Sequence, residues 1–173
     1  MMHKTMQKLP LELDAAKLKE IAPERLQGQS VAAVLLALGS NYQAKYYFPR
    51  VHKSLAALGE IQITTAFQNP DFTATLEHPK PDYTNQCVYL SLTDSTTLQQ
   101  LQKIFKSFEG DCNRQRPIEP ATIRQVTMDI DILLIKLDSK NNNCSDEWMI
   151  MADRYPFKAH ESAGIVELVE SSL

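Results

Sequence analysis

Two aspartates interrupt an apolar stretch of the sequence. The segment 126–135 reads VTMDIDILLI and places Asp129 and Asp131 two residues apart. On a β-strand, such residues point to the same side, about 6.6 Å apart along the chain. Buried like charges are unfavourable unless a cation lies with them, and Mg²⁺ takes one or two carboxylates together with substrate phosphates. The spacing is compatible with a magnesium site, although two aspartates on a solvated sheet face are the commoner explanation of so short a motif.

Three arginines lie just upstream of this aspartate pair. Arg114, Arg116 and Arg124 belong to a proline-containing stretch, 111–125. Arginine can hold phosphate oxygens through two parallel hydrogen bonds and stays charged. The arrangement would suit a polyphosphate bound with Mg²⁺, but a solvated basic loop is the better explanation of the arginines taken alone. The sequence contains neither G-x-x-x-x-G-K-[ST] nor G-x-G-x-x-G, which excludes a Walker or Rossmann phosphate cradle.

A third pair of residues could recognise a flat ligand. Tyr83 and Asn85 are also two residues apart, at the start of an alternating stretch, YTNQCVYLSLT. A tyrosine ring can stack on a heteroaromatic ring, and an asparagine amide offers a donor and an acceptor together. Ordinary side chains at the start of a strand explain the same pair and are favoured for it in isolation.

The composition excludes several classes of protein. The 173 residues carry a net charge of −3, so we expect no general attraction to nucleic acid or to an anionic membrane. Three cysteines, without a C-x-x-C spacing, are typical of reduced thiols and predict a cytoplasmic protein. We expect no secretory signal and no membrane span, because no apolar run approaches about 20 residues.

The pattern of apolar residues predicts one α+β domain behind an N-terminal arm. Residues 1–30 could form short amphipathic helices, interrupted near Pro23, and the domain would span 31–173. The expected elements of the domain are strands at 31–39, 61–68, 83–93 and 126–135 and helices at 46–58 and 95–110. The order βαββαβ is that of a ferredoxin-like fold, an antiparallel sheet with helices packed on it.

Local signals refine these elements. Thr96 and Gln99 resemble a capping box at the start of the second helix, and Pro49 would be tolerated in the first turn of the first helix. Leu98, Leu101, Phe105 and Phe108 would form the buried stripe of the second helix. In the last strand, the side chains predicted to face the core are Met128, Ile130, Ile132 and Leu134.

Five stretches together resemble the 6-hydroxymethyl-7,8-dihydropterin pyrophosphokinases of folate biosynthesis. These are ALGSN, LAALGEI, PDYTNQCVYLSLT, FEGDCNRQR and VTMDIDILL, and they occur in the same order as in that family. The resemblance covers roughly residues 31–136. It implies transfer of pyrophosphate from ATP to the hydroxymethyl group of a dihydropterin with two Mg²⁺ ions. Charge neutralisation by metal and arginine is what such a transfer needs.

The resemblance also implies roles for individual residues. Asp129 and Asp131 would hold the metal ions. Phe72, Tyr83 and Asn85 would line the pterin pocket, with Asn85 reading the amide edge of the pterin. The residues implied at the ATP site are Glu109, Arg116, Ile132, Arg154 and Tyr155. Arg114, Arg116 and Arg124 would act on the phosphates during catalysis.

The chain departs from the family pattern at several positions. Val126 stands where the family has an arginine, Asn113 stands where it has a glycine, and Arg154 stands where it has a histidine. The family also has a tryptophan in its mobile loop, whereas the single tryptophan here is Trp148. Arg124 lies two residues before Val126, so on an extended strand it would face the same way and could substitute for the missing arginine.

Two other functions stay open at this point. A diverged relative could bind pterin and nucleotide without transferring pyrophosphate, which Val126 and the missing loop tryptophan favour. An unrelated two-metal enzyme, such as a nuclease or a glycosyltransferase, could also use a D-x-D strand. The low positive charge and the Tyr83–Asn85 pair count against that last possibility. The sequence leaves the oligomeric state open, with a monomer slightly favoured.

Overall fold

The protein has an α+β fold built on one mixed sheet. The computed structural model describes residues 18–71, 73–114, 125–138 and 148–170. In these ranges there are seven strands and three α-helices. The strands are β1 (Lys19–Ile21), β2 (Ser30–Ser40), β3 (Gly59–Ile63), β4 (Phe67–Asn69), β5 (Tyr83–Thr97), β6 (Asp129–Leu137) and β7 (Trp148–Met151). The helices are α1 (Ala44–Ala56), α2 (Leu98–Asp111) and α3 (Ala159–Glu170), with 3₁₀ turns η2 (Pro23–Arg25) and η3 (Ala152–Arg154).

Strand β2 lies inside the sheet and pairs with β5 on one side and β6 on the other, antiparallel in both cases. Its sequence, SVAAVLLALGS, is continuously apolar because both of its faces are buried. The strand order is β1-β7-β6-β2-β5-β3, with β4 also paired to β5, and only β1 and β7 run parallel. The predicted strand at 31–39 is confirmed, whereas the sheet is larger than the one predicted.

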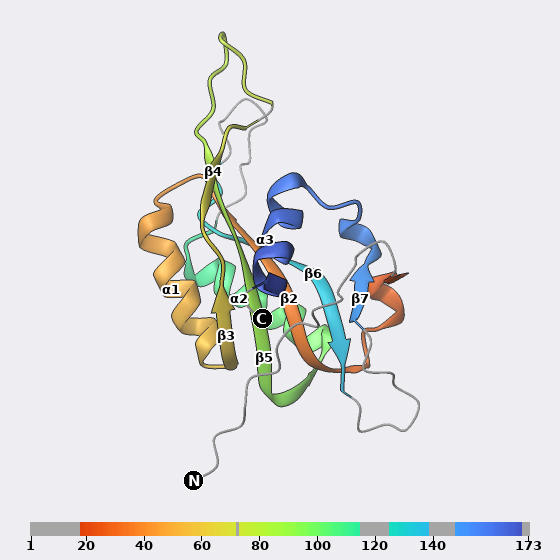
Figure 1. Ribbon diagram of the computed structural model, residues 1–173. Helices are drawn as coiled ribbons and strands as arrows, with labels where there is room; N and C mark the ends of the chain where they lie inside the picture. The colour runs from red at the N-terminus through yellow and green to blue at the C-terminus, as the bar shows by residue number, and fades with distance from the viewer. Residues whose placement is uncertain (1–17, 72, 115–124, 139–147, 171–173) are drawn as a thin grey trace.

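The two faces of the sheet are covered by different helices (Figure 1). Helices α1 and α2 pack on one face, where Phe48 and Leu101 join a core with Leu36 and Ile132. Helix α3 packs on the other face, where Ile165 and Leu168 join a second core with Leu35, Tyr89 and Trp148. The loop that follows β4 extends beyond both layers at one end of the sheet (Figure 1).

Both predicted helices form, with corrections at their N-termini. The capping box of α2 uses Thr97 and Gln100, one residue later than predicted. The sequence TTLQQ offers two such pairs, and the extension of β5 to Thr97 selects the second pair. Helix α1 begins at Ala44, so Pro49 lies in its second turn rather than its first. Glu109, not Phe108, completes the buried stripe of α2, and Phe108 is only partly buried.

The strands differ from prediction at three places. The expected strand at 61–68 is two strands, β3 and β4, which both pair with β5. Strand β6 begins at Asp129, so residues 126–128 precede it. A register shift between β2 and β6 adds one residue, Leu133, between Ile132 and Leu134. All four side chains predicted to face the core are buried, but Leu134 lies in the core on the α3 side, whereas Met128, Ile130 and Ile132 lie in the core on the α1 and α2 side.

Segments at both ends of the described chain complete the sheet. Lys19–Ile21 is a strand rather than part of a helix, and it extends the sheet beyond β7. After η2, the carbonyls of Gln27 and Gln29 accept hydrogen bonds from Gln99 and Leu98 at the start of α2. Residues 1–17 lie outside the described residues, and the division of the chain at residue 30 stays a prediction. The sequence pattern did not predict β7, η3 and α3.

Among the described residues, none of the helices combines the length and the apolarity that crossing a membrane requires.

We expect Gly164→Ala to destabilise the fold, although alanine favours a helix over glycine by about 1 kcal/mol. A Cβ at Gly164 would lie 2.7 Å from the Cβ of Cys87 and closer still to its Sγ, so α3 would have to move away from β5. Overpacking of this kind costs about 1–3 kcal/mol. Equilibrium unfolding in urea measures the change.

Gly110→Ala in α2 is the matched control, because a Cβ at that position meets no atom within 4 Å. It should raise the free energy of unfolding by about 0.5 kcal/mol. A Gly164→Ala protein as stable as the wild type would contradict the close packing of α3 against β5.

Candidate active site

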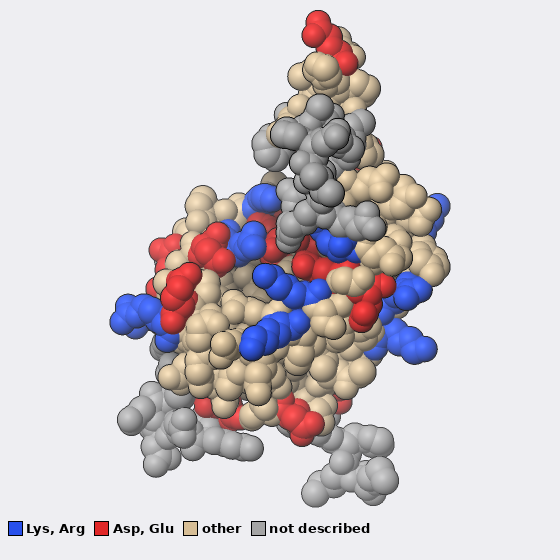
Figure 2. All heavy atoms as spheres, turned by 180° about the vertical axis from the view of Figure 1, so that it is seen from behind, with Lys and Arg blue, Asp and Glu red and all other residues tan. Residues whose placement is uncertain are grey.

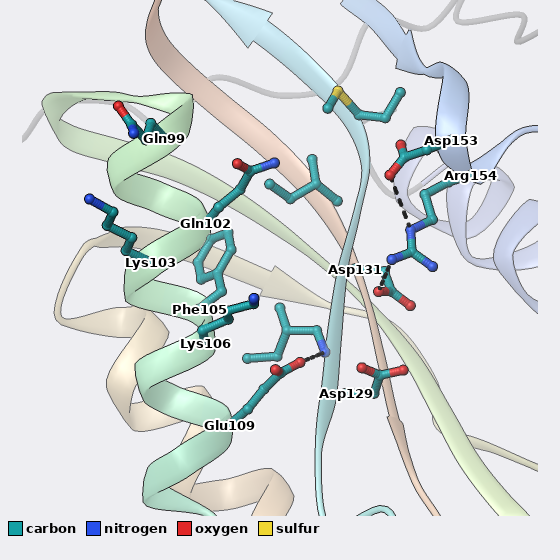
Figure 3. A pocket seen from close by; sticks show the side chains of 13 residues that line it. Gln99, Gln102, Lys103, Phe105, Lys106, Glu109, Asp129, Asp131, Asp153 and Arg154 are labelled. Carbon is teal, nitrogen blue, oxygen red and sulfur yellow. Dashed lines mark hydrogen bonds and ion pairs between the residues drawn. The ribbon is translucent and has the colours of Figure 1, made fainter. Parts of the chain in front are cut away.

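A cleft of about 460 Å³ lies beside β6, between α2 and η3 (Figure 3). Strand β7 pairs with β6 only at Leu134–Lys136, so no described strand pairs with the outer edge of Asp129–Leu133. That exposed strand edge and the neighbouring helix form the walls of the cleft. The cleft therefore exists because β7 is shorter than β6.

Glu109 occupies part of this strand edge. Its Oε2 accepts a hydrogen bond from the backbone N–H of Ile130 at 2.8 Å, so one outward-pointing peptide group is satisfied by a side chain of α2 (Figure 3). Ile132 is two residues further along β6, so its peptide groups also point toward the cleft. The two predicted ATP-site residues Glu109 and Ile132 are thus brought together at one strand edge, and both line the cleft.

The aspartate pair lies on the opposite side of β6 from Ile130 and Ile132. Asp129 pairs with Gly39 of β2, and Asp131 pairs with Ala37. Both aspartates also line the cleft, so the two carboxylates approach it from the same strand. The i and i+2 geometry that the sequence predicted places them on one face of the sheet.

Asn85 lies in the same row of the sheet as Asp129. Gly39 of β2 pairs with Asn85 on one side and with Asp129 on the other. A Cβ on Gly39 would lie 3.2 Å from the Nδ2 of Asn85, so the glycine leaves a shallow space between an amide and a carboxylate. Directly paired residues share a face, so the predicted metal and pterin residues are on one side of the sheet.

Tyr83 and Asn85 keep the geometry that the sequence predicted. Both lie at the start of β5, two residues apart, and both are half-buried. The Oδ1 of Asn85 accepts a hydrogen bond from the Nδ2 of Asn69 on β4 at 2.8 Å, which fixes the orientation of the amide. The Nδ2 of Asn85 is then directed toward Gly39. Phe72, the third predicted pterin residue, lies outside the described residues.

Two carboxyl groups of the cleft have raised pKa values. Burial raises the pKa of Glu109 to about 7, the Ile130 N–H opposes this rise, and the charge of Asp129 adds to it. Burial also raises the pKa of Asp131 to about 6, where Asp129 adds to the rise and Arg154 opposes it. The site therefore gathers more negative charge than its surroundings stabilise, and a bound cation would relieve it.

Arg154 supplies part of the missing positive charge. Its Nη2 lies 2.8 Å from the Oδ1 of Asp131, and its Nε lies 3.8 Å from the Oδ2 of Asp153 (Figure 3). Tyr155 follows Arg154 but does not line the cleft, and its ring packs edge-on against Phe157. Arg154 and Tyr155 were both predicted at the ATP site, but only Arg154 lines the cleft.

Of the wall opposite Arg154, the sequence predicted only Glu109. Gln102, Lys106 and Glu109 line the cleft from α2 at positions i, i+4 and i+7, and Lys106 reaches toward β6 (Figure 3). This polar stripe beside the apolar stripe was the signal available in the sequence. Seen from behind, acidic and basic side chains lie close together on this face of the molecule (Figure 2).

Asn41 holds the segment before β6 at Val126, the position where the family has an arginine. The backbone N–H of Val126 donates to the Oδ1 of Asn41 at 2.6 Å, and the N–H of Asn41 donates to the carbonyl of Val126 at 2.8 Å. Val126 is only 2% exposed, so the residue at the family's arginine position is part of the interior. The Asn of the ALGSN stretch thus fixes the chain that leads into the aspartate strand.

The predicted arginines are described only in part. The guanidinium of Arg114 donates to the carbonyl of Gln125 at 3.4 Å, so it contacts the segment before β6. Arg116 and Arg124 lie outside the described residues. The prediction that Arg124 faces the same way as Val126 stays a prediction, although β6 begins only at Asp129, after both residues.

Within the described residues, no group of three or more His, Cys, Asp or Glu side chains could hold a metal ion by itself. The aspartate pair nevertheless fits Mg²⁺, which needs only one or two protein carboxylates when phosphates and water supply the other oxygens. The charge on the pair and its position at the mouth of a cleft fit a metal that arrives with a phosphate ligand.

Comparison with protein families identifies the chain. The family model of 7,8-dihydro-6-hydroxymethylpterin-pyrophosphokinase (HPPK) matches residues 35–153. The chain belongs to the HPPK family. HPPK enzymes are ATP-dependent pyrophosphokinases of folate biosynthesis that bind a dihydropterin and use Mg²⁺. The matched span begins within β2, ends at Asp153 in η3, and includes every residue that lines the cleft except Arg154. The predicted family is confirmed. Comparison with curated proteins gives no match.

We expect the metal-free protein to lose stability as the pH rises from about 4.5 to above 7. The folded pKa of Glu109, about 7, is above the ordinary value of 4.5, so ionising this carboxyl disfavours the folded state. The loss is at most about 3 kcal/mol. Urea unfolding at a series of pH values, with a chelator present, measures it.

Glu109→Gln should flatten the part of this pH dependence that lies above about pH 6, because the amide oxygen can still accept from Ile130 but cannot ionise. Asp131, whose pKa is raised to about 6, still contributes at lower pH. The exposed Glu77→Gln is the matched control and should leave the dependence unchanged. An unchanged slope in Glu109→Gln would show that other groups cause the loss.

Proposed function

We propose that this protein transfers the pyrophosphate group of ATP to the hydroxymethyl group of 6-hydroxymethyl-7,8-dihydropterin with two Mg²⁺ ions. One observation carries the proposal. The Asp129 and Asp131 pair lines the cleft beside α2, and Asp129 is also one residue across Gly39 from Asn85. The carboxylates are therefore next to both a nucleotide-sized cleft and the candidate pterin residues.

The cleft is the proposed ATP site. Its volume, about 460 Å³, lies in the range of small-molecule sites, about 300–1,000 Å³. The outward peptide groups at Ile132 can pair with the edge of the adenine, while Glu109 keeps the neighbouring peptide group occupied. Lys106 and Arg154 face the cleft from opposite walls and supply charge for the phosphates. The roles of Arg116 and Tyr155 at this site rest on the family resemblance alone.

The proposed pterin site lies over Gly39, between Asn85 and the aspartates. Asn69 holds the Asn85 amide with its Nδ2 directed inward, where it can donate to the carbonyl of the pterin ring. Tyr83, on the same face two residues away, can stack on the ring or border it. Phe72 completes the set by resemblance.

The chemistry that follows is positioning and charge neutralisation. The hydroxymethyl oxygen of the pterin attacks the β-phosphorus of ATP, a new O–P bond forms, and the bond to the α-phosphate oxygen breaks to release AMP. The hydroxyl proton leaves to solvent. Magnesium held by Asp129 and Asp131 would neutralise charge on the transferred group. Lys106 and Arg154 would orient the phosphates, and Arg114, Arg116 and Arg124 remain candidate phosphate ligands by resemblance.

A second function is favoured by one observation. Val126 is buried and tied to Asn41 where the family has an arginine, so one cation of the family pattern is replaced by an apolar interior residue. A protein that binds pterin and nucleotide but transfers pyrophosphate slowly or not at all would show the same structure. The location in the cell and the oligomeric state stay predictions.

We expect AMP to form from ATP when the protein is incubated with Mg²⁺ and 6-hydroxymethyl-7,8-dihydropterin, and only when the pterin is present. Asp129→Asn should lower the rate at least about 100-fold, because the developing charge would lose its metal. Chromatography of the nucleotides measures both. Asp94→Asn, which removes an exposed carboxylate, is the control and should leave the rate unchanged.

Two other outcomes would decide between a transferase and a binding protein. Pterin binding by calorimetry without AMP release would replace the transferase with a binding protein. Absence of both pterin binding and AMP release would contradict the two proposals together.

We expect Asn85→Ala to raise the KM for the pterin about tenfold or more while the KM for ATP changes little. The amide contributes a hydrogen bond to a buried ligand edge, and losing such a bond costs about 1–3 kcal/mol. Steady-state kinetics with each substrate varied in turn measures the effect. Asn69→Ala is the matched control, because it removes only the hydrogen bond that orients Asn85, and its effect should be smaller. Equal changes in both KM values would contradict a pterin-specific role.

A further inference from the structure

The ion pair between Arg154 and Asp131 places a cation of the protein on a proposed metal ligand. Nη2 of Arg154 is 2.8 Å from Oδ1 of Asp131, whose side chain is only 19% exposed. Among the described residues, this arginine is the cation that forms an ion pair with the aspartate pair. The contact partly offsets the repulsion between Asp131 and Asp129.

A divalent ion cannot share this arrangement without cost. Metal at Oδ1 of Asp131 would lie within a few ångströms of the guanidinium, and two cations so close repel each other. Metal that binds alone at this oxygen therefore has to displace the guanidinium. The arginine would lose its buried partner and keep only Asp153, whose contact is longer at 3.8 Å.

Nucleotide phosphates would provide Arg154 with a replacement partner. Its side chain is 45% exposed and it lines the same cleft as Lys106 on the opposite wall. Guanidinium groups bind phosphate and carboxylate with the same paired geometry, so rotation of one side chain exchanges one anion for the other. This exchange leaves Oδ1 of Asp131 available to metal.

We propose that Arg154 couples metal binding to nucleotide binding by moving from Asp131 to the phosphates. This rests on the proposed function, which supplies the metal and the nucleotide. Without ligands, Arg154 neutralises Asp131 and opposes binding of metal alone. With nucleotide in the cleft, Arg154 pairs with phosphate and metal takes its place on the aspartate. The protein then holds Mg²⁺ tightly only when the co-substrate is present.

The test measures binding of each ligand alone, so that activity is not the readout. Titration of the full-length protein with Mn²⁺, followed by electron paramagnetic resonance, gives the affinity for metal without nucleotide. Calorimetry with a non-hydrolysable ATP analogue in the presence of a chelator gives the affinity for nucleotide without metal. Arg154→Met should bind Mn²⁺ alone about tenfold more tightly and the analogue alone about tenfold more weakly.

Two further variants make the result specific. Lys106→Met removes a cation from the opposite wall, and it should weaken the analogue while changing the affinity for Mn²⁺ alone less than threefold. In an Asp131→Asn background, Arg154→Met should no longer tighten Mn²⁺ binding, because the pair that opposes metal is already broken. Thermal unfolding of each variant confirms that it is folded.

The outcomes separate this inference from the function on which it rests. Opposite changes in the two affinities support the exchange. If Arg154→Met weakens both ligands, the arginine serves only to shape the site, and the inference is overturned. Unchanged affinity for Mn²⁺ alone, in a protein that still forms AMP, overturns the inference and leaves the proposed function intact. A wild-type protein that binds neither ligand overturns both.

Discussion

The antiparallel pairing of β2 with β5 and β6 is the constraint on which the candidate site depends. This register places Asn85, Gly39 and Asp129 in one row and Cys87, Ala37 and Asp131 in the next. A slip of one residue between β2 and β6 would turn the aspartates to the opposite face of the sheet, and the same slip between β2 and β5 would turn Asn85 away from them. The short β7 then leaves the outer edge of β6 to α2 and η3, and the cleft forms at that edge. The register of the strands therefore decides which side chains meet in the candidate site.

The charged groups of the cleft influence one another. Glu109 and Asp131 are both held in surroundings that disfavour their ionised forms, and Asp129 adds to the effect on each. Lysine and arginine reach the cleft from separate walls, Lys106 from α2 and Arg154 from η3. A phosphate chain with its metal ions would bring alternating charges into this arrangement, which explains why a site with so many acids can attract an anionic ligand.

The sequence predicted the parts of the fold that are determined by local patterns. The apolar run of β2, the helix after Thr97 and the alternating β5 carry strong periodic signals, and the D-x-D spacing placed two carboxylates on one face. The bulge at Leu133 could not be predicted, because it arises from the pairing of two distant strands. Val126 was recognised as a departure, but its burial depends on Asn41, 85 residues away. The wall formed by Lys106 was missed because a polar stripe on a helix usually faces solvent.

The segment before β2 is held both through its backbone and by a few side chains, of which Leu26 joins the core and Ile21 packs against it. Strand β1 pairs with β7, and the carbonyls of Gln27 and Gln29 accept from the first peptide groups of α2, so this segment touches the elements on both sides of the cleft. Backbone contacts of this kind constrain the length of the segment more than the identity of its exposed residues. The family match begins at residue 35, inside β2, so this outer support of the cleft lies outside the matched part of the chain.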